Sequence, residues 1–430
     1  MNCPRRSGFP HGVAWGSPVD TGSMRRLLTA AALASALLLT PAAAAQAHDR
    51  PVRFATYNLS LNRPAEGLLR EHLANPDVDD VFRRQAHNVA EVIQRARPDV
   101  VLLNEFDYDP EAARLFERNF LAVSQNGAPA QRYPYRYVAP SNTGIASGFD
   151  LNNNGVIDTT PGDQAYGDDS YGFGLFPGQY GMVVYSKYPI DLKSVRTFQL
   201  FKWKDMPGNL IPADFYSPAA RDVLRLSSKS HWDVPVRIHG RTVHFLVSHP
   251  TPPTFDGPED RNGRRNHDEI RFWSDYVKSA RYIYDDRGHR GGLKPGQAFV
   301  IAGDQNADPN DGDSYDSAVH QLLDNRLINS RTTPSSAGAA EAATLQGGAN
   351  ATHKGNPKYD TADFADTAPG NLRADYVLPR VGLRVKGSGV FWPVQADPLS
   401  RLSGVYDPVW APVNGFPTSD HRLVWLDLSV

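Results

Sequence analysis

The segment Gly303–Asn306, which reads Gly-Asp-Gln-Asn, follows directly after the apolar run Ala298–Ala302. Alternate side chains of a strand point to the same face, so we expect Asp304 and Asn306 to share one face at the carboxyl end of a buried strand. Near the end of the chain, Ser419–His421 leads into another apolar strand-like run. Carboxylates, carboxamides and imidazoles are groups that bind cations and move protons. The two strand ends therefore predict one shared polar site.

Other strand-like runs in the sequence also end in polar residues. Any one of them is explained by an ordinary capped strand end or loop. Taken together they would be costly in a stable core, because a buried charge must be paired or must bind a metal ion. The set therefore predicts a catalytic site, although no single member does. Its members are Asn58, Glu105, His249, Asp304, Asn306, Asp375, Asp420 and His421.

The elements that must position these residues are mostly strands. Strands outnumber helices and often follow one another directly, which favours an α/β sandwich with largely antiparallel sheets over a Rossmann repeat. Two long segments, 141–179 and 330–366, have the composition of loop insertions with little regular structure. We expect residues 48–430 to form a single domain. The expected strands are 52–58, 99–105, 181–185, 234–238, 242–249, 298–303, 374–378 and 422–428, and the expected helices are 81–97 and 264–284.

The amino-terminal segment has the order of a secretory signal. Arg25 and Arg26 are followed by the apolar stretch 27–39 and then by small residues up to position 47. A charged region, a hydrophobic region and a small-residue cleavage site in that order are typical of export. We therefore expect Met24 to be the true start, residues 1–47 to be removed, and the mature protein to be secreted. An uncleaved amino-terminal anchor is the alternative, although the apolar stretch is short for a membrane span.

The composition argues against several classes of protein. The single cysteine, Cys3, lies in the expected signal, so the mature protein would have no disulfide and no thiol nucleophile. The net charge is −2, and removal of residues 1–47, which carry +3, leaves −5. A mildly acidic protein lacks the broad basic surface of a tight nucleic-acid binder. A Gly-x-Ser-x-Gly elbow, a His-Glu-x-x-His helix and a P-loop are all missing from the sequence.

Six short motifs, taken in order, resemble those of the endonuclease/exonuclease/phosphatase superfamily, which includes pancreatic deoxyribonuclease, inositol polyphosphate 5-phosphatases and neutral sphingomyelinases. The resemblance spans the mature chain. It implies a four-layer α-β-β-α sandwich of two mostly antiparallel sheets flanked by helices, and the divalent-metal-dependent hydrolysis of phosphate esters. The motifs lie at 54–58, 99–105, 248–249, 303–306, 373–376 and 419–421.

The resemblance implies metal binding for three of the polar residues. Glu105 matches a family ligand of the divalent ion, and its hard carboxylate oxygens suit Mg²⁺ or Mn²⁺ rather than Zn²⁺. Asn58 would assist at the same ion or on the phosphate. Asp420 would either share in metal binding or polarise His421, which matches a histidine that contacts the scissile phosphate.

The resemblance also implies catalytic roles for four other residues. Asp304 matches the base that orients the attacking water, and Asn306 matches a neighbour that holds a phosphate oxygen. His249 matches a second phosphate-facing histidine, which in its protonated form would stabilise charge or protonate the leaving group. Asp375 would orient His249 or a neighbouring group. Asp107 departs from the pattern, because the pancreatic nuclease has an arginine there that helps to hold nucleic acid.

A basic cluster opens the helix expected after His249. We hypothesise that its cations select a phosphate group beyond the scissile one, because several cations and a helix amino terminus would converge on an anion. A solvated basic turn is the alternative. The members of the cluster are Arg261, Arg264, Arg265 and His267.

The first insertion contains half of a calcium loop, Asp-x-Asn-x-Asn-Gly-x-Ile. Pro161 occupies the position where a bidentate glutamate would close such a loop, so Asp163, Asp168 or Asp169 would have to replace it. An ordinary turn rich in Asn and Gly is the alternative to a structural Ca²⁺ site. The candidate ligands are Asp150, Asn152, Asn154 and Asp158.

These features favour a secreted, divalent-metal-dependent phosphoesterase that acts on small phosphorylated organic compounds with the help of His and Asp side chains. An extracellular nuclease is the first alternative, and nucleic acid is not the favoured substrate. A sphingomyelinase-like lipid phosphodiesterase is the second alternative, and it would need an exposed aromatic hairpin. A non-catalytic binding protein is the third and would lack one of the polar residues. The aromatic candidates for the hairpin are Tyr171, Phe173, Phe176 and Tyr180.

Overall fold

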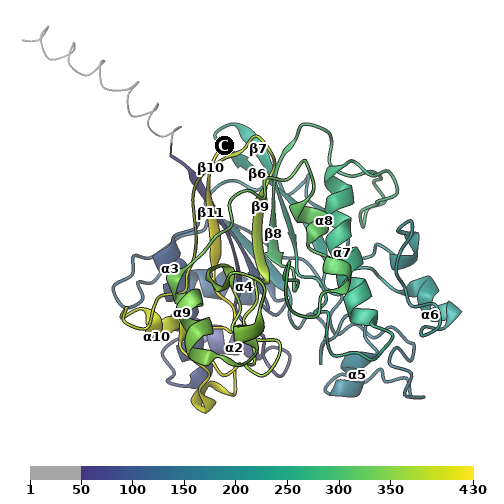
Figure 1. Ribbon diagram of the computed structural model, residues 1–430, viewed down its shortest axis with the longest axis horizontal. Helices are drawn as coiled ribbons and strands as arrows, with labels where there is room; N and C mark the ends of the chain where they lie inside the picture. Colours follow the sequence, from purple (N-terminus) through teal and green to yellow (C-terminus); the bar gives the residue numbers. More distant parts are fainter. Residues whose placement is uncertain (1–49) are drawn as a thin grey trace, which may run out of the picture. The chain divides into compact units, whose positions relative to one another are not determined.

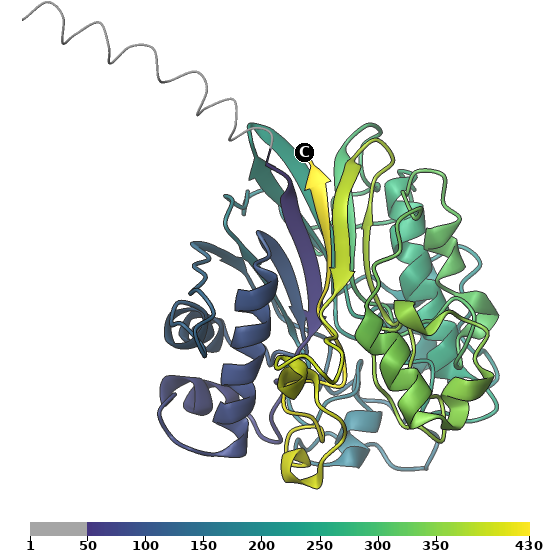
Figure 2. The same ribbon diagram turned by 60° about the vertical axis from the view of Figure 1, so that its left-hand side comes forward.

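Two β-sheets pack face to face, and helices cover both outer faces. The computed structural model describes residues 50–430, of which Pro51–Val430 form one compact unit. Figure 1 and Figure 2 show the helix, sheet, sheet, helix order of the layers within this unit. The predicted α-β-β-α sandwich is therefore confirmed. The expected signal at residues 1–47 lies outside the described residues.

Each sheet contains one parallel pair of strands, and its other neighbours are antiparallel. The parallel pairs are β1 with β2 and β7 with β8. Strands β3, β5 and β10 were not expected from the sequence. In spatial order the first sheet is β10 (Arg384–Val390), β11 (Val424–Ser429), β1 (Val52–Asn58), β2 (Val100–Asn104), β4 (Met182–Ser186) and β3 (Tyr135–Tyr137). The second sheet is β5 (Arg196–Thr197), β6 (His231–Ile238), β7 (Arg241–Ser248), β8 (Ala298–Asp304) and β9 (Asp375–Pro379).

The inner faces of the two sheets form a continuous apolar core. Phe54 of β1 and Ala302 of β8 belong to this core, and alternate residues of both strands face it. Continuing the alternation places Asn58 and Asp304 at the end of the same inner faces. β7 follows the same pattern, which directs the residue after it, His249, to the core end. The strand alternation therefore brings polar residues together at one end of the sheet interface.

Two long helices cover the outer faces. α3 packs on the first sheet through Val89 and Ile93, which contact the core that contains Leu103 of β2. α7 packs on the second sheet through residues such as Trp273. The α-helices are α2 (Leu68–Ala74), α3 (Val81–Ala96), α4 (Pro110–Phe116), α5 (Gln164–Asp168), α6 (Pro218–Val223), α7 (Arg261–Val277), α8 (His320–Leu323), α9 (Ala337–Gln346) and α10 (Ser400–Ser403). Short helical turns lie at Glu117–Leu121, Trp203–Asp205, Tyr315–Ser317, Gly348–Thr352, Pro357–Tyr359 and Pro408–Trp410.

Two predictions about helices need correction. The helix expected at 264–284 begins at Arg261 and ends at Val277, because Ser279 takes a left-handed conformation with φ 64° and turns the chain back. The segment 330–366 is not largely irregular, because it contains α9 and two short helical turns. The helix was missed because its Ala-rich sequence has no apolar periodicity. The segment 141–179 contains only the five-residue α5 among regular helices, as expected.

Within residues 50–430, every helix falls short of the length and apolar character that a membrane span requires.

Candidate active site

Asp304 is the centre of a buried polar cluster at the end of the two inner faces. Its Oδ2 accepts a hydrogen bond from Asn58 Nδ2 at 3.1 Å. The Nε2 atoms of His249 and His421 lie 3.4 Å and 3.5 Å from the same oxygen. Side chains from both sheets, separated by more than three hundred positions in the sequence, therefore meet at one carboxylate oxygen.

Asn58 links Asp304 to the predicted metal ligand. Its Nδ2 also donates to Glu105 Oε1 at 3.0 Å, while its Oδ1 accepts from the backbone N–H of Ser60 at 3.2 Å. The acceptor role of Oδ1 leaves the amide nitrogen for the two carboxylates. Glu105 has φ 55° and Asn306 has φ 50°, an uncommon conformation for residues other than glycine. Such backbone strain often occurs at functional sites.

The carboxyl ends of β7 and β8 lie in close contact. A Cβ atom on Gly303, which has φ 153°, would lie 2.0 Å from the carbonyl oxygen of Ser248, so a larger residue would push the strands apart. Asn306 Nδ2 donates to the carbonyl of Pro250 at 3.1 Å. Its backbone N–H donates to Asp304 Oδ1 at 2.8 Å. The loops that follow the two strands are therefore tied to each other.

His421 is oriented by Asp375, so the neighbouring group that was expected as an alternative to His249 is this second histidine. Asp375 Oδ2 lies 2.9 Å from His421 Nδ1, so Asp375 orients this histidine rather than His249. Among the described residues, Asp420 makes no hydrogen bond to His421, although its charge adds to the rise in the pKa of this histidine. Asp420 accepts from the hydroxyl of Ser60 at 3.0 Å instead. The register explains why Asp375 contacts His421. Asp375 pairs with Asp304 across β8 and β9, so it lies beside the histidine that reaches Asp304.

The surroundings raise the pKa values of both central carboxyl groups. Burial raises the pKa of Glu105 to about 7, and the charge of Asp420 adds to the rise. Burial also raises the pKa of Asp304 to about 6, although the charge of His421 opposes the rise. The carboxylates of Glu105 and Asp420, both partly exposed, repel each other, and a bound cation would offset this repulsion.

The two histidines have opposite electrostatic surroundings. Burial opposes protonation of His421, but the charges of Asp375 and Asp304 outweigh it and hold its pKa well above the ordinary value. Burial and the charges of Lys229 and His421 hold the pKa of His249 well below the ordinary value. We expected a protonated imidazole at His249, whereas the structure favours the proton on His421.

The donor set suits a hard divalent cation. Ligand atoms of Asp304, Asp375 and His421 lie within 4.8 Å of one another. Asp375 Oδ1 is buried and accepts no hydrogen bond from the described residues. Glu105, which is partly exposed, contributes a further carboxylate to the same network. Carboxylate and carboxamide oxygens together favour Mg²⁺ or Mn²⁺.

Sequence reasoning missed three residues of this network. Asn104 ends β2, and its Oδ1 accepts from the backbone N–H of Asp304 at 3.3 Å. Thr361 donates to Asp375 Oδ2 at 2.8 Å from the segment that was expected to be a loop insertion. Lys229 is 7% exposed and acts electrostatically on Glu105. Asn104 ends an expected strand and was within reach of the strand-end argument, whereas Lys229 precedes its strand.

The basic cluster at the start of α7 contacts other parts of the protein. The guanidinium of Arg265 donates to the backbone carbonyls of Leu226, Arg225 and Tyr171. Arg261 pairs with Glu259, Arg264 donates to the carbonyl of Glu259, and His267 pairs with Asp268. Among residues 50–430, no hydrogen bond or ion pair joins the four side chains to Glu105, Asp304, Asp375 or His421. The phosphate clamp stays a prediction.

The half calcium loop adopts a tight turn. Asp150 accepts from the backbone N–H groups of Asn154 and Gly155, and Asn152 Oδ1 accepts from Asn154 as well. Asp169 accepts from the backbone N–H groups of Leu151 and Asp158. These hydrogen bonds are also those of an ordinary turn rich in Asn and Asp. The structural Ca²⁺ site stays a prediction.

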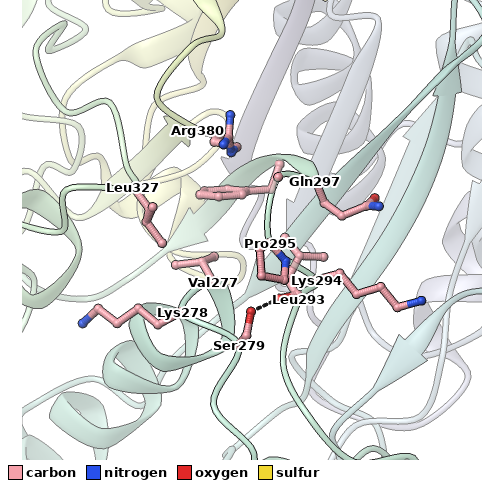
Figure 3. A pocket seen from close by; sticks show the side chains of 11 residues that line it. Val277, Lys278, Ser279, Leu293, Lys294, Pro295, Gln297, Leu327 and Arg380 are labelled. Atoms are coloured by element: carbon pink, nitrogen blue, oxygen red, sulfur yellow. Dashed lines mark hydrogen bonds between the residues drawn. The ribbon is translucent and has the colours of Figure 1, made fainter.

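A separate cavity of about 280 Å³ lies beside the C-terminal end of α7 and the beginning of β8, away from the polar cluster (Figure 3). None of the residues that surround Asp304 lines it. The polar cluster is therefore a distinct site at the opposite ends of the strands. The cavity is lined by Val277, Lys278, Ser279, Leu293, Lys294, Pro295, Gly296, Gln297, Phe299, Leu327 and Arg380.

Comparison with known proteins agrees with this site. The model of the Endonuclease/Exonuclease/phosphatase family matches residues 55–421, so the chain belongs to that family. The chain is therefore a metal-dependent phosphoric ester hydrolase, the class of enzyme that this family comprises. The match runs from the first strand of the polar cluster to His421. No curated protein sequence matches the chain closely enough to count as a relative.

Three solved structures illustrate the likeness. An endonuclease/exonuclease/phosphatase from Beutenbergia cavernae is 19% identical, with a TM-score of 0.48, over 88% of this chain and 71% of that chain. The human nocturnin catalytic domain with bound sulfate is 14% identical, with a TM-score of 0.43, over 88% and 94%. A beta toxin variant from Staphylococcus aureus with bound magnesium ions is 13% identical, with a TM-score of 0.41, over 88% and 99%.

Proposed function

We propose that this protein is a secreted, divalent-metal-dependent phosphoesterase that hydrolyses phosphate esters of small organic compounds by attack of water. The convergence of Asn58, His249 and His421 on Asp304 Oδ2 carries the proposal. This arrangement places one carboxylate between an amide and two imidazoles that can face a phosphoryl group. The pKa of Asp304, raised by burial to about 6, suits a base that works near neutral pH.

Each residue of the cluster has a part in this proposal. Asp304 accepts a proton from the attacking water at Oδ2. His421, protonated and held by Asp375, offsets the negative charge that develops on the phosphoryl oxygens. Asn306 keeps the loop after β8 in place through Pro250. The hydrogen bonds between these residues fix the positions of their side chains before substrate binds.

Glu105 and Asp420 are the residues that would hold a Mg²⁺ or Mn²⁺ ion, and Asn58, whose Nδ2 donates to Glu105, would assist beside it. Such an ion neutralises phosphoryl oxygens and stabilises the leaving alkoxide. The raised pKa of Glu105 beside Asp420 supports a cation at this position, because the cation would relieve the repulsion between the two carboxylates. The turn at Asp150 remains the candidate for a structural Ca²⁺ ion.

Two observations bear on the alternative substrates. Asp107 accepts from the backbone N–H groups of Arg63 and Tyr180, so its carboxylate orders two loops and is no evidence for or against nucleic acid. The aromatic hairpin expected of a lipid phosphodiesterase gains no support. Phe176 is buried and the ring of Tyr171 is covered by Arg225, which leaves Phe173 as the member with a large exposed fraction. A small organic phosphate therefore remains the favoured substrate.

Export of the protein is supported by the order of charged, apolar and small residues in the segment 1–47. A mature chain without cysteine would be indifferent to the oxidising conditions outside the cell. The first residue of protein recovered from the culture medium tests this part of the proposal. A chain that begins at Met1 or Met24 and stays with the cells would reject it.

The central experiment assays the purified protein with Mg²⁺, Mn²⁺ or Ca²⁺ on a phosphomonoester, a phosphodiester, a phosphorylated inositol and DNA. Glu105→Ala should lose nearly all turnover, by at least about 10³-fold, because it removes a metal ligand. The exposed Glu66→Ala is the matched control and should keep full activity. An active Glu105→Ala variant, or a wild-type protein that hydrolyses none of these esters with any metal, would reject the proposed function.

A further inference from the structure

Lys229 is a buried cation that lacks a partner. It is 7% exposed, and its ammonium group makes no hydrogen bond or ion pair with any residue in the described range 50–430. Buried lysines are rare, because the loss of hydration is unfavourable unless a nearby group compensates for it. The side chain therefore requires an explanation that the fold alone does not give.

The backbone on either side of Lys229 is held firmly. Ser228 donates its backbone N–H to Glu269 Oε1 at 2.7 Å, and Thr251 donates its own to Glu269 Oε2 at 2.6 Å. The carbonyl of Lys229 accepts from the backbone N–H of Asn142 at 2.8 Å. One buried carboxylate of α7 thus clamps together the segment that carries Lys229 and the segment that follows His249.

The register of the sheet places Lys229 beside the catalytic cluster. His231 pairs with Ser248 across β6 and β7, so Lys229 and His249 leave the sheet on neighbouring strands at the same end. The charge of Lys229 acts on Glu105 and His249, and the carboxylate of Asp304 acts on Lys229 in return. The ammonium group is therefore near these residues without contacting any of them.

We propose that Lys229 binds a non-bridging oxygen of the substrate's phosphoryl group, which makes it a substrate-binding residue of the active site. The proposal rests on the proposed function, because it places the phosphoryl group against Asp304 and His249. A phosphoryl group offers several anionic oxygens, so a metal ion at Glu105 would leave oxygens for a second cation. Glu269 attracts the ammonium group through its charge, but both of its oxygens accept from backbone N–H groups and, among the described residues, neither makes a hydrogen bond or ion pair with the ammonium group of Lys229.

Burial lowers the pKa of Lys229, while the carboxylates of Glu269, Glu105 and Asp304 oppose this change. A bound phosphoryl anion would add to the groups that favour the charged form. Lys229 would then carry its full charge when substrate is present. A charge-assisted contact of this kind is stronger than a neutral hydrogen bond, and it would act on binding and on the transition state alike.

The test measures binding as well as turnover. Inorganic phosphate is titrated calorimetrically into the wild-type protein and into Lys229→Met and Lys229→Arg, all with saturating Mg²⁺, and kcat/KM is measured on the best ester. Lys229→Met should weaken phosphate binding and lower kcat/KM by at least about 10-fold each. Lys229→Arg should recover part of both. The exposed Lys278→Met is the matched control and should behave like wild type.

Two further measurements separate this role from a structural one. Lys229→Met should bind Mn²⁺ as tightly as wild type and should be no less stable, because it removes a buried unpaired charge. Lys229→Gln is a second neutral variant in case the methionine variant does not fold. Unchanged phosphate affinity in a folded neutral variant would overturn the proposal for Lys229 even if the wild-type protein is an active phosphoesterase. A wild-type protein that binds phosphate but hydrolyses no ester would reject the proposed function alone.

Discussion

Two buried polar networks lie a few residues apart, and they differ in how completely their atoms are paired. In the network at the middle of α7, both carboxylate oxygens of Glu269 accept hydrogen bonds, from three donors in all, and Asp268 accepts from Trp203 and from the backbone N–H of Leu210. In the network around Asp304, the buried atoms Asp375 Oδ1 and His249 Nδ1 have no partner.

This difference in pairing distinguishes residues that hold the structure from residues that take part in the reaction. A buried carboxylate with both oxygens engaged, such as that of Glu269, holds loops in place, and its removal leaves an unsatisfied donor in the core. A partly paired network has unpaired donor and acceptor atoms that can bind a cation or a substrate. Glu269 therefore positions the site from outside, whereas Asp375 and His249 belong to it. The predictions below test this division.

The largest effect is expected for Asp375→Asn. The amide can still contact His421, but it removes the charge that favours the protonated imidazole, so kcat should fall by on the order of 10²-fold or more. The melting temperature should change little, because Asn has nearly the same volume. Steady-state kinetics with saturating Mg²⁺, together with a thermal melt, measures both quantities. A kcat within threefold of wild type would show that the His421–Asp375 pair is structural.

The motif residues could be predicted from the sequence because strand alternation and strand ends are visible there. Asn58, Asp304 and His249 lie at the ends of expected strands, and the structure brings all three together. The partner of His421 could not be predicted in the same way. It depends on the pairing of β8 with β9 and on the hydrogen bond from Thr361 to Asp375. Thr361 lies outside the expected strands, so strand alternation does not indicate this contact.

Lys229 was missed for a related reason. It lies in the run 227–230, which consists of serines around one lysine and has no apolar alternation of its own. Its position is fixed by Glu269, a residue of α7 whose partners are backbone groups of two distant loops. Contacts between a side chain and distant backbone leave no periodic signal in a sequence. α9 was missed because alanine gives a helix without an apolar stripe.

A smaller effect, on stability rather than on chemistry, is expected for Glu269→Gln. The amide offers one acceptor oxygen to two segments that each donate a backbone N–H, so one donor loses its partner at a cost of about 1–3 kcal/mol. The free energy of unfolding, from urea denaturation, should fall by that amount. Glu269→Gln should lower the free energy of unfolding more than Asp375→Asn does, and it should lower kcat less. The exposed Glu66→Gln serves as the control, and equal stability of the two variants would contradict the architectural role of Glu269.

The smallest effect concerns Asp360, a buried carboxylate outside both networks that forms no ion pair with any other residue of the described range 50–430. Burial raises its pKa to about 8, and the charges of Asp308 and Asp311 add to the rise. Because this pKa lies above the unfolded value of about 3.9, the folded state binds the proton more tightly, and wild-type stability should fall as the pH rises from about 4 to about 8. Asp360→Asn cannot lose a proton and should escape this loss.

The Asp360→Asn variant should match wild type at pH 4 and gain at least about 1 kcal/mol over it at pH 8.5, which corresponds to roughly one pKa unit. Its kcat should equal that of wild type. Thermal melts across this pH range and one kinetic assay measure both. This outcome would show that one unpaired buried group does not by itself indicate a catalytic site. Several unpaired groups would have to face one another, as they do around Asp304. A variant that is less stable at pH 8.5, or inactive, would instead extend the functional network to Asp360.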